Sequence, residues 1–181
     1  NPTDTSFIQY HPQGLTSYFQ ITSVLQDSEG DIWFGTFHGG LYRYKPQEDS
    51  MIIYDSGRDK LANNWVSCIT EESNGDVWVG TWGGGITRFS NGKLTTFNNS
   101  NGLKDHKIRT ITEDLEGNIL IGTNDHGLLI FKGGRFLKYG EKEGLSNPHV
   151  YAIYEDKEHN LWFGTNKGIS IYDPSTKEME Y

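Results

Sequence analysis

Cysteine is almost absent from this sequence of 181 residues, and Cys68 is the single one. An internal disulfide is therefore excluded, and so few cysteines are compatible with either the cytoplasm or an exported bacterial protein. No stretch approaches the roughly 18 consecutive apolar residues of a membrane helix. The first residues also lack the basic and apolar regions of a signal peptide. We therefore expect a soluble segment, either mature or excised from a longer protein.

Positive charge is also scarce, because 16 basic residues face 24 acidic ones and leave a net charge of −8. Such a charge repels phosphate backbones and anionic membranes, so nucleic acid is not expected as a partner. Alanine and methionine, which favour helices, are rare, whereas glycine (22 residues) and aromatic residues (13%) are abundant. This composition is typical of short strands joined by tight turns and predicts an all-β fold.

One period dominates the chain. The pair Gly-Thr follows an apolar run four times, with its glycine at positions 35, 80, 122 and 164. Fourteen residues before each glycine stands a β-branched residue: Ile21, Val66, Ile108 or Val150. A repeat of 42 to 45 residues is typical of propeller blades, whereas a solenoid coil is usually shorter and a sandwich shows no such repeat. The sequence predicts a β-propeller segment of four consecutive four-stranded antiparallel blades.

The four repeats cover about residues 14–54, 60–97, 102–139 and 144–181. In the first repeat we expect strands at residues 21–26, 32–34, 41–44 and 51–54, with equivalent strands in the others. Residues 6–10 match the last strand of a preceding blade, so we predict that the chain is an excerpt of a larger propeller. Its first and last blades would expose apolar faces, and self-association is expected.

Features that recur in every repeat are expected to be structural. The paired carboxylates, such as Glu71 with Glu72, stand at a turn. The Gly-Thr pairs lack the helix and lysine of a phosphate-binding loop, and we interpret them as turn and packing positions. The six histidines show no metal-ligand spacing, and Cys68 replaces small side chains of the other repeats, so we interpret it as a packing residue. No catalytic residue, metal or cofactor is predicted.

The candidate site lies on loops that vary between repeats. In a propeller, the loop entering the innermost strand and the loop between the second and third strands emerge on one face. Here these loops carry aromatic rings beside histidines and a carboxylate, which is the composition of a surface that stacks on sugars. The predicted ligand-binding residues are Tyr18, Phe19, Phe37, His38, Trp65, Trp82, His106, Asp125, His126 and His149. Contact with a protein and packing of the loops against one another stay open as alternatives.

The units resemble the two-component regulator propeller repeat. Its pattern is a β-branched pair, Glu-Asp, a turn glycine, Asn, then Leu-Trp-Phe-Gly-Thr; all four units follow it, and residues 155–165 are the closest copy. The linking run at residues 144–148 also fits. The resemblance implies the periplasmic sensor region of a hybrid histidine kinase, with an oligosaccharide or another small ligand as partner. The kinase, and any attachment to a membrane, would belong to the parent protein.

Three functions are compatible with these observations. The first is a non-catalytic sensor for an oligosaccharide or other small ligand, and the second is a platform for protein interaction. The third is a lyase or hydrolase of the kind that some propellers support. The third is disfavoured because the polar residues are scattered, without an obvious pair of nucleophile and base.

Overall fold

The computed structural model describes residues 20–103 and 105–181 and places them in four antiparallel sheets of four strands each. The expected strand at residues 6–10 lies outside the described residues. The strands of the first two sheets are β1 (Ile21–Gln26), β2 (Ile32–Thr36), β3 (Leu41–Lys45), β4 (Ser50–Tyr54), β5 (Val66–Glu71), β6 (Val77–Thr81), β7 (Ile86–Ser90) and β8 (Lys93–Phe97). Those of the other two are β9 (Ile108–Glu113), β10 (Ile119–Thr123), β11 (Leu128–Lys132), β12 (Arg135–Tyr139), β13 (Val150–Glu155), β14 (Leu161–Thr165), β15 (Gly168–Asp173) and β16 (Glu178–Glu180).

Helix is confined, in the described ranges, to two short 3-10 turns, η1 (Asn99–Asn101) and η2 (Glu141–Glu143). None of the described segments forms a helix with the length and apolar character needed to cross a membrane. The all-β prediction is confirmed.

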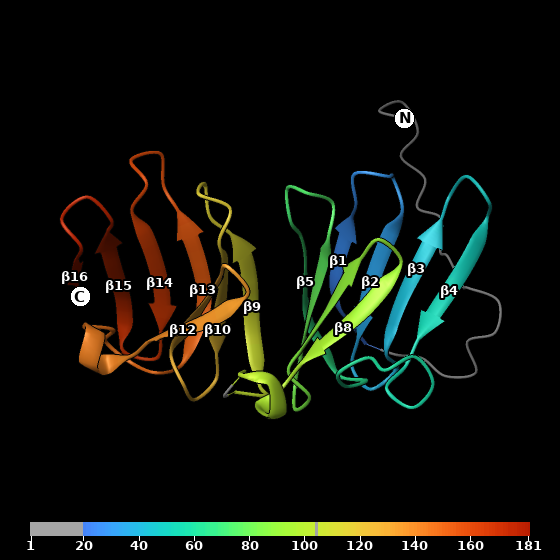
Figure 1. Cartoon of the computed structure of the whole chain (residues 1–181), viewed down its shortest axis with the longest axis horizontal. Helices are drawn as coiled ribbons and strands as arrows, with labels where there is room; N and C mark the ends of the chain where they lie inside the picture. Colours follow the sequence, from blue (N-terminus) through green and yellow to red (C-terminus); the bar gives the residue numbers. More distant parts are fainter. Residues whose placement is uncertain (1–19, 104) are drawn as a thin grey trace.

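The sheets are the blades of a propeller, which we number 1 to 4 along the chain. In each blade the strand order follows the sequence, from an inner strand (β1, β5, β9 or β13) to an outer one (β4, β8, β12 or β16). The inner strands pack in order, β1 on β5, β5 on β9 and β9 on β13. Figure 1 shows the blades side by side in an arc, with blade 1 in blue and cyan on the right and blade 4 in red on the left. Four consecutive four-stranded blades are as predicted.

The turn between the first two strands of a blade is closed by a carboxylate that also holds a tryptophan. In blade 1, Asp27 Oδ1 accepts the backbone N–H groups of Glu29 (3.1 Å) and Asp31 (2.8 Å). Asp27 Oδ2 accepts the indole N–H of Trp33 at 2.7 Å. Gly30 completes the turn with a φ of +90°, a conformation that favours glycine. The second carboxylate of the recurring pair is therefore structural.

The first carboxylate of each pair crosses to the neighbouring blade. Glu71 of blade 2 accepts the backbone N–H of Ser28 in blade 1 at 2.9 Å. Glu113 of blade 3 accepts the backbone N–H of Ser73 in blade 2 at 2.7 Å. Both carboxylates of the pair are thus used in the scaffold, which supports the structural interpretation made from the sequence.

The recurring glycine lies where the next blade makes its closest approach. At Gly35 an added Cβ would stand 2.6 Å from Cγ1 of Val66, and at Gly80 it would stand 2.7 Å from Cγ2 of Ile108. The following threonine ends the second strand, and the Thr36 hydroxyl donates to the carbonyl of Gly40 at 2.8 Å. The Gly-Thr pair was interpreted as a turn and packing position; the structure places it inside the end of a strand, because both residues stay paired with the inner strand.

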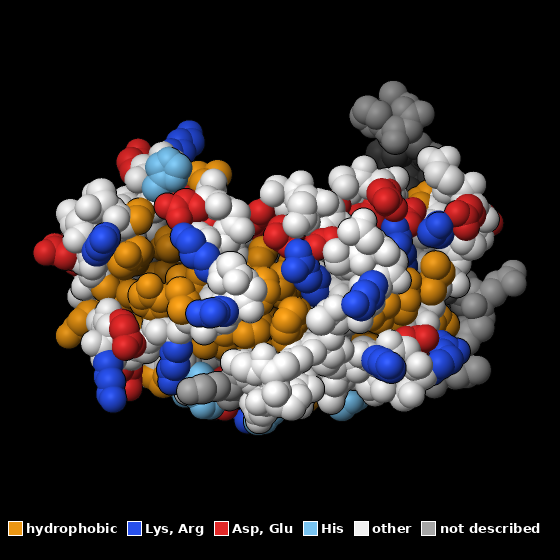
Figure 2. Space-filling model, viewed as in Figure 1, with side chains coloured by type: hydrophobic (Ala, Val, Ile, Leu, Met, Phe, Trp, Pro, Cys, Tyr) orange, Lys and Arg blue, Asp and Glu red, His pale blue; other side chains and the backbone are white. Residues whose placement is uncertain are grey.

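Blades 1 and 4 each present one face that no described blade covers. Trp33 in blade 1 is 1% exposed, whereas Trp162, at the same position of blade 4, is 36% exposed. On the opposite face, Val24 of blade 1 is 60% exposed and its equivalent in blade 2, Ile69, is 8% exposed. Figure 2 shows hydrophobic side chains in a band between the polar turns above and the loops below, widest over blades 3 and 4 on the left.

Candidate ligand-binding face

The loops that enter the inner strands and the loops between the second and third strands lie on one face, at the lower edge of Figure 1. Backbone hydrogen bonds tie the two loops of a blade together, since the Trp82 N–H donates to the carbonyl of Trp65 at 2.8 Å. Others tie neighbouring blades, since the Gly83 N–H donates to the carbonyl of His106 at 2.7 Å. The loops therefore form one continuous platform.

A row of aromatic rings runs across this platform from blade 1 to blade 2. Phe37 makes an edge contact with Trp65 at 4.4 Å between ring centroids, and His38 lies 5.3 Å from Trp65. Trp65 in turn lies 5.5 Å from Trp82. Phe37 keeps 37% of its surface exposed, and both tryptophans stay partly exposed. Four of the predicted residues are thus brought together as a partly open surface.

Arg109 and Tyr151 extend the row, and sequence reasoning missed both. The Arg109 guanidinium lies 4.4 Å from the ring centroid of Trp82 and 4.5 Å from that of Tyr151. Its Nε and Nη2 donate to Asn124 Oδ1 at 3.0 and 2.5 Å. Among the described residues, no carboxylate lies within ion-pair distance of Arg109, whereas Arg43 forms three ion pairs. Arg109 therefore links the rings of blades 2 and 4 and keeps its charge uncompensated by a nearby carboxylate.

A signal for these two residues was present in the sequence. The second position of the inner strand is Thr22 in blade 1 and Ser67 in blade 2, and both donate their hydroxyl to the next inner strand. Arg109 and Tyr151 break this pattern. They were overlooked because the site was sought only in loops, although the second position of the strand opens onto the same face.

Blades 3 and 4 contribute a polar cluster. His126 Nδ1 lies 3.1 Å from Oδ2 of Asp105, which is buried. Asp125 lies 3.5 Å from the Lys107 ammonium and 3.8 Å from His149 Nδ1. Asp105 was not predicted as a site residue, but it fixes the position of His126, which was.

The remaining predicted residues, His106, His149, Tyr18 and Phe19, add little to the description of the site. The exposed side chain of His106 makes no hydrogen bond or ring contact within the described part of the chain, and only its carbonyl ties the loops. His149 Nδ1 contacts the carbonyl oxygen of Asn124. Tyr18 and Phe19 lie outside the described residues.

Two groups outside this face resemble sites but are used in packing. Asp27, Glu29 and Asp31 bring carboxylate oxygens within 4.8 Å of one another. Arg43 fills this group, with contacts of 3.5, 2.8 and 2.7 Å to the three residues in that order. Burial raises the pKa of the Cys68 thiol to about 12, so the thiolate is suppressed at neutral pH, as expected of a packing residue.

Asp105 makes the stability of the platform depend on pH. Burial would raise its pKa, but the N–H groups of Lys107 and Asp125 and the ring of His126 outweigh burial and hold the pKa below its usual value. A carboxyl with a lowered pKa stabilises the fold above its unfolded pKa, which is about 4, and this contribution is lost as the pH falls through the folded pKa.

We expect Asp105→Asn to lower the free energy of unfolding by about 1–3 kcal/mol at neutral pH, because buried donors lose a charged acceptor. The difference from the unmodified chain should shrink in acid. Urea denaturation at a series of pH values measures this, and a difference that is constant at every pH would contradict it.

Comparison with known proteins identifies the repeats. Residues 14–38, 60–83 and 144–167 match the family model of the two-component regulator propeller. The pattern was expected in all four units; the third, which has Leu120 at the tryptophan position, is not among the matched segments. No curated protein matches the chain at a significant level.

Several solved structures share the fold. The chain is 31% identical to the extracellular domain of BT3049 from B. thetaiotaomicron, described as a hybrid two-component system, with a TM-score of 0.84 over 94% of this chain and 24% of that one. It is 27% identical to the extracellular domain of BT4673 from the same organism, described as a one-component system, with a TM-score of 0.78 over 93% of this chain and 25% of that one.

The chain therefore spans about a quarter of the length of these two domains. Virginiamycin B lyase from Staphylococcus aureus is 20% identical, with a TM-score of 0.66 over 88% of this chain and 54% of that one, and shares the fold alone. Together with the four-blade architecture, the matched segments in blades 1, 2 and 4 show that the chain contains two-component regulator propeller repeats.

Proposed function

We propose that this chain is part of a non-catalytic sensor module in the periplasmic portion of a two-component signalling protein, and that its lower face binds an oligosaccharide. The single observation that carries the proposal is the partly exposed row of rings from Phe37 through Trp65 to Trp82. The likeness to the extracellular domains of a hybrid two-component system and of a one-component system supports the sensor role and the extracytoplasmic location.

Saccharides suit this row for a physical reason. A sugar ring presents C–H groups on its faces and hydroxyls at its edge, so it stacks on an aromatic ring while polar groups bind its rim. Here the polar cluster of Asp105, His126 and Asp125 lies on the next blade along the same platform. Backbone hydrogen bonds between the loops hold both parts in place, which reduces the entropy lost on binding.

We expect Trp82→Ala to weaken oligosaccharide binding about five- to tenfold, because one stacked ring contributes about 1 kcal/mol. Trp65→Ala should act similarly. Calorimetric titration of the chain with a panel of oligosaccharides measures both effects. Tyr154→Ala is the control, since this ring is exposed on the flank of blade 4, away from the platform. If neither tryptophan substitution changes the affinity for a bound oligosaccharide, the binding site lies elsewhere.

One observation favours a lyase as the second candidate. A buried carboxylate, Asp105, orients the ring of His126, which is the arrangement of a general base. Incubation with each bound oligosaccharide separates the two functions, because a sensor returns the ligand unchanged and a lyase leaves an unsaturated product. Loss of that product in the His126→Ala variant would establish that the chain is a lyase and that His126 takes part in catalysis.

A further inference from the structure

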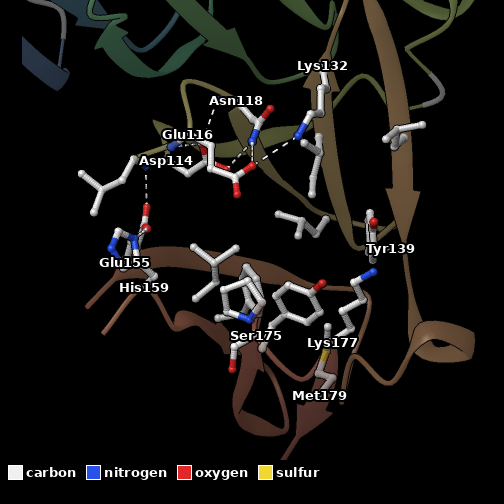
Figure 3. A pocket seen from close by; sticks show the side chains of 18 residues that line it. Asp114, Glu116, Asn118, Lys132, Tyr139, Glu155, His159, Ser175, Lys177 and Met179 are labelled. Atoms are coloured by element: carbon white, nitrogen blue, oxygen red, sulfur yellow. Dashed lines mark hydrogen bonds and ion pairs between the residues drawn. The ribbon is translucent and has the colours of Figure 1, made fainter. Parts of the chain in front are cut away.

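A cavity of about 640 Å³ lies between blades 3 and 4, away from the loop platform. Its floor is apolar and its rim carries charged and polar side chains, among them Glu116, Lys132 and Lys177 (Figure 3). The volume is in the range of pockets that hold small molecules. The other two junctions of the chain show what normally fills this place.

At the junction of blades 1 and 2, the space is filled by Trp33. Its indole stacks on Tyr54 at 6.0 Å between centroids and makes an edge contact with Phe89 of blade 2 at 5.1 Å. The guanidinium of Arg43 covers the ring at 4.8 Å, and the indole N–H donates to Asp27. The tryptophan is thus held by two aromatic rings, a cation and a carboxylate.

The junction of blades 2 and 3 repeats this arrangement. Trp78 stacks on Phe97 at 5.7 Å and contacts Phe131 at 5.2 Å. Its N–H donates to Glu72 at 2.8 Å, and Arg88 lies over the ring at 5.0 Å. An indole with an N–H aimed at a carboxylate is therefore the regular occupant of the junction.

At the junction of blades 3 and 4 the indole and the arginine over it are both replaced, but the carboxylate and the two aromatic rings remain. Leu120 stands at the tryptophan position and Ile130 at the arginine position, as the strand register shows. Asp114, Tyr139 and Tyr172 occupy the positions of the carboxylate and the two rings, and all three line the cavity. The replacement of a tryptophan by a leucine accounts for the space.

Asp114 retains the capacity to accept an N–H from a ring. Its Oδ2 accepts the amide of Asn118 at 2.8 Å. In blade 4, Asp156 Oδ2 accepts the equivalent amide of Asn160 at 3.1 Å and also the indole N–H of Trp162 at 2.7 Å. One carboxylate oxygen therefore serves both donors in the same local setting.

We propose that this cavity binds a planar aromatic ligand that carries a ring N–H, with indole as the simplest member of the class. The ring packs against Tyr139 and Tyr172 beside Ile130, and its N–H donates to Asp114 Oδ2. The ligand thereby reproduces the contacts that Trp33 and Trp78 make with the two rings and the carboxylate at their own junctions, while Ile130 stands in place of the arginine. This site is separate from the loop platform, so its occupation does not depend on the proposed binding of saccharide.

The probe is indole, titrated into the chain by calorimetry and followed by the thermal midpoint. We expect saturable binding with a rise in midpoint. Indene, which has the same shape and no N–H, should bind at least fivefold more weakly. Leu120→Trp supplies the missing ring from the chain and should abolish binding of indole without lowering the midpoint.

Tyr154→Ala, on the uncovered flank of blade 4, is the control that should bind indole normally. Absence of saturable binding, or full binding by a folded Leu120→Trp variant, would overturn the proposal. Equal affinity for indole and indene would overturn the role of Asp114 and the ring N–H. If the Leu120→Trp variant does not fold, the comparison of the two ligands on the unmodified chain still decides.

Discussion

Replacing Gly80 with alanine should lower the free energy of unfolding by about 1–3 kcal/mol, the range of overpacked interiors. The added Cβ would lie 2.5 Å from the Cys68 sulfur and 2.7 Å from Cγ2 of Ile108, both in a packed junction. Neither atom can withdraw cheaply, because Ile108 is fully buried and belongs to the inner strand of blade 3. The blades would have to separate slightly. Urea denaturation monitored by tryptophan fluorescence measures the loss.

Gly164 provides a matched control within the same chain. It occupies the equivalent position of blade 4, and the nearest atom to an added Cβ is Cβ of Ala152 at 3.5 Å, an ordinary contact. Gly164→Ala should change the stability by less than about 0.5 kcal/mol, as at most uncrowded positions. Equal destabilisation by the two substitutions would show that strand propensity, rather than the contact between blades, requires glycine.

The isolated chain should self-associate head to tail, with the uncovered flank of blade 1 against that of blade 4. Ile21 is 51% exposed, whereas its equivalents Val66, Ile108 and Val150 are fully buried against the preceding blade. Within the chain each of these three equivalents packs on the glycine of the preceding blade's Gly-Thr pair, and Gly164 is the glycine of blade 4 at that position. We propose that Ile21 of one copy packs on Gly164 of the next, because this is how the blades pack within the chain. A head-to-tail contact closes into a ring or extends into a longer array, depending on its angle.

Sedimentation over a range of concentrations measures this association, and we expect a mass above that of the monomer. Gly164→Val should reduce it strongly, since the side chain occupies the place of Ile21 while meeting little within its own blade. Leu115→Ser is the control, because it removes an exposed apolar side chain from a turn away from the flanks. A monomer at every concentration, or equal effects of the two substitutions, would refute the head-to-tail contact.

The fold could be predicted because the same contacts are imposed four times. The spacing from Val66 to Gly80 is that of an inner strand, a turn of fixed length and a second strand. An insertion or deletion within it would shift the pairing of the two strands and disturb the contacts with both neighbouring blades. Strand ends were less predictable. The second strands extend through the Gly-Thr pair, because the threonine hydroxyl continues the ladder into the next loop.

The candidate site was predictable only in part. Aromatic residues in loops, such as Trp65 and Trp82, stand out in the sequence, because a loop on the surface has no core for a large apolar ring to fill. Arg109 and Tyr151 belong to inner strands, and only the structure shows that the Arg109 guanidinium lies against the rings of both Trp82 and Tyr151. The substitution at Leu120 is visible in the sequence, but the cavity it leaves depends on Tyr139 and Tyr172, which come from different blades.

Because a carboxylate of each following blade binds the first turn of the blade before it, the stability of a blade depends on the blade that follows it in the sequence. In the first turn of blades 1, 2 and 3, one backbone N–H donates to a glutamate of the following blade: that of Ser28 to Glu71, that of Ser73 to Glu113 and that of Leu115 to Glu155. Each blade thus relies on its successor for an acceptor that its own residues do not supply. Local opening of blade 4 would release a turn of blade 3, whereas opening of blade 1 leaves the acceptor of blade 2 on an intact strand. Fraying should therefore spread more readily from the carboxyl-terminal side, and the smallest cooperative unit is a blade together with the inner strand of the next.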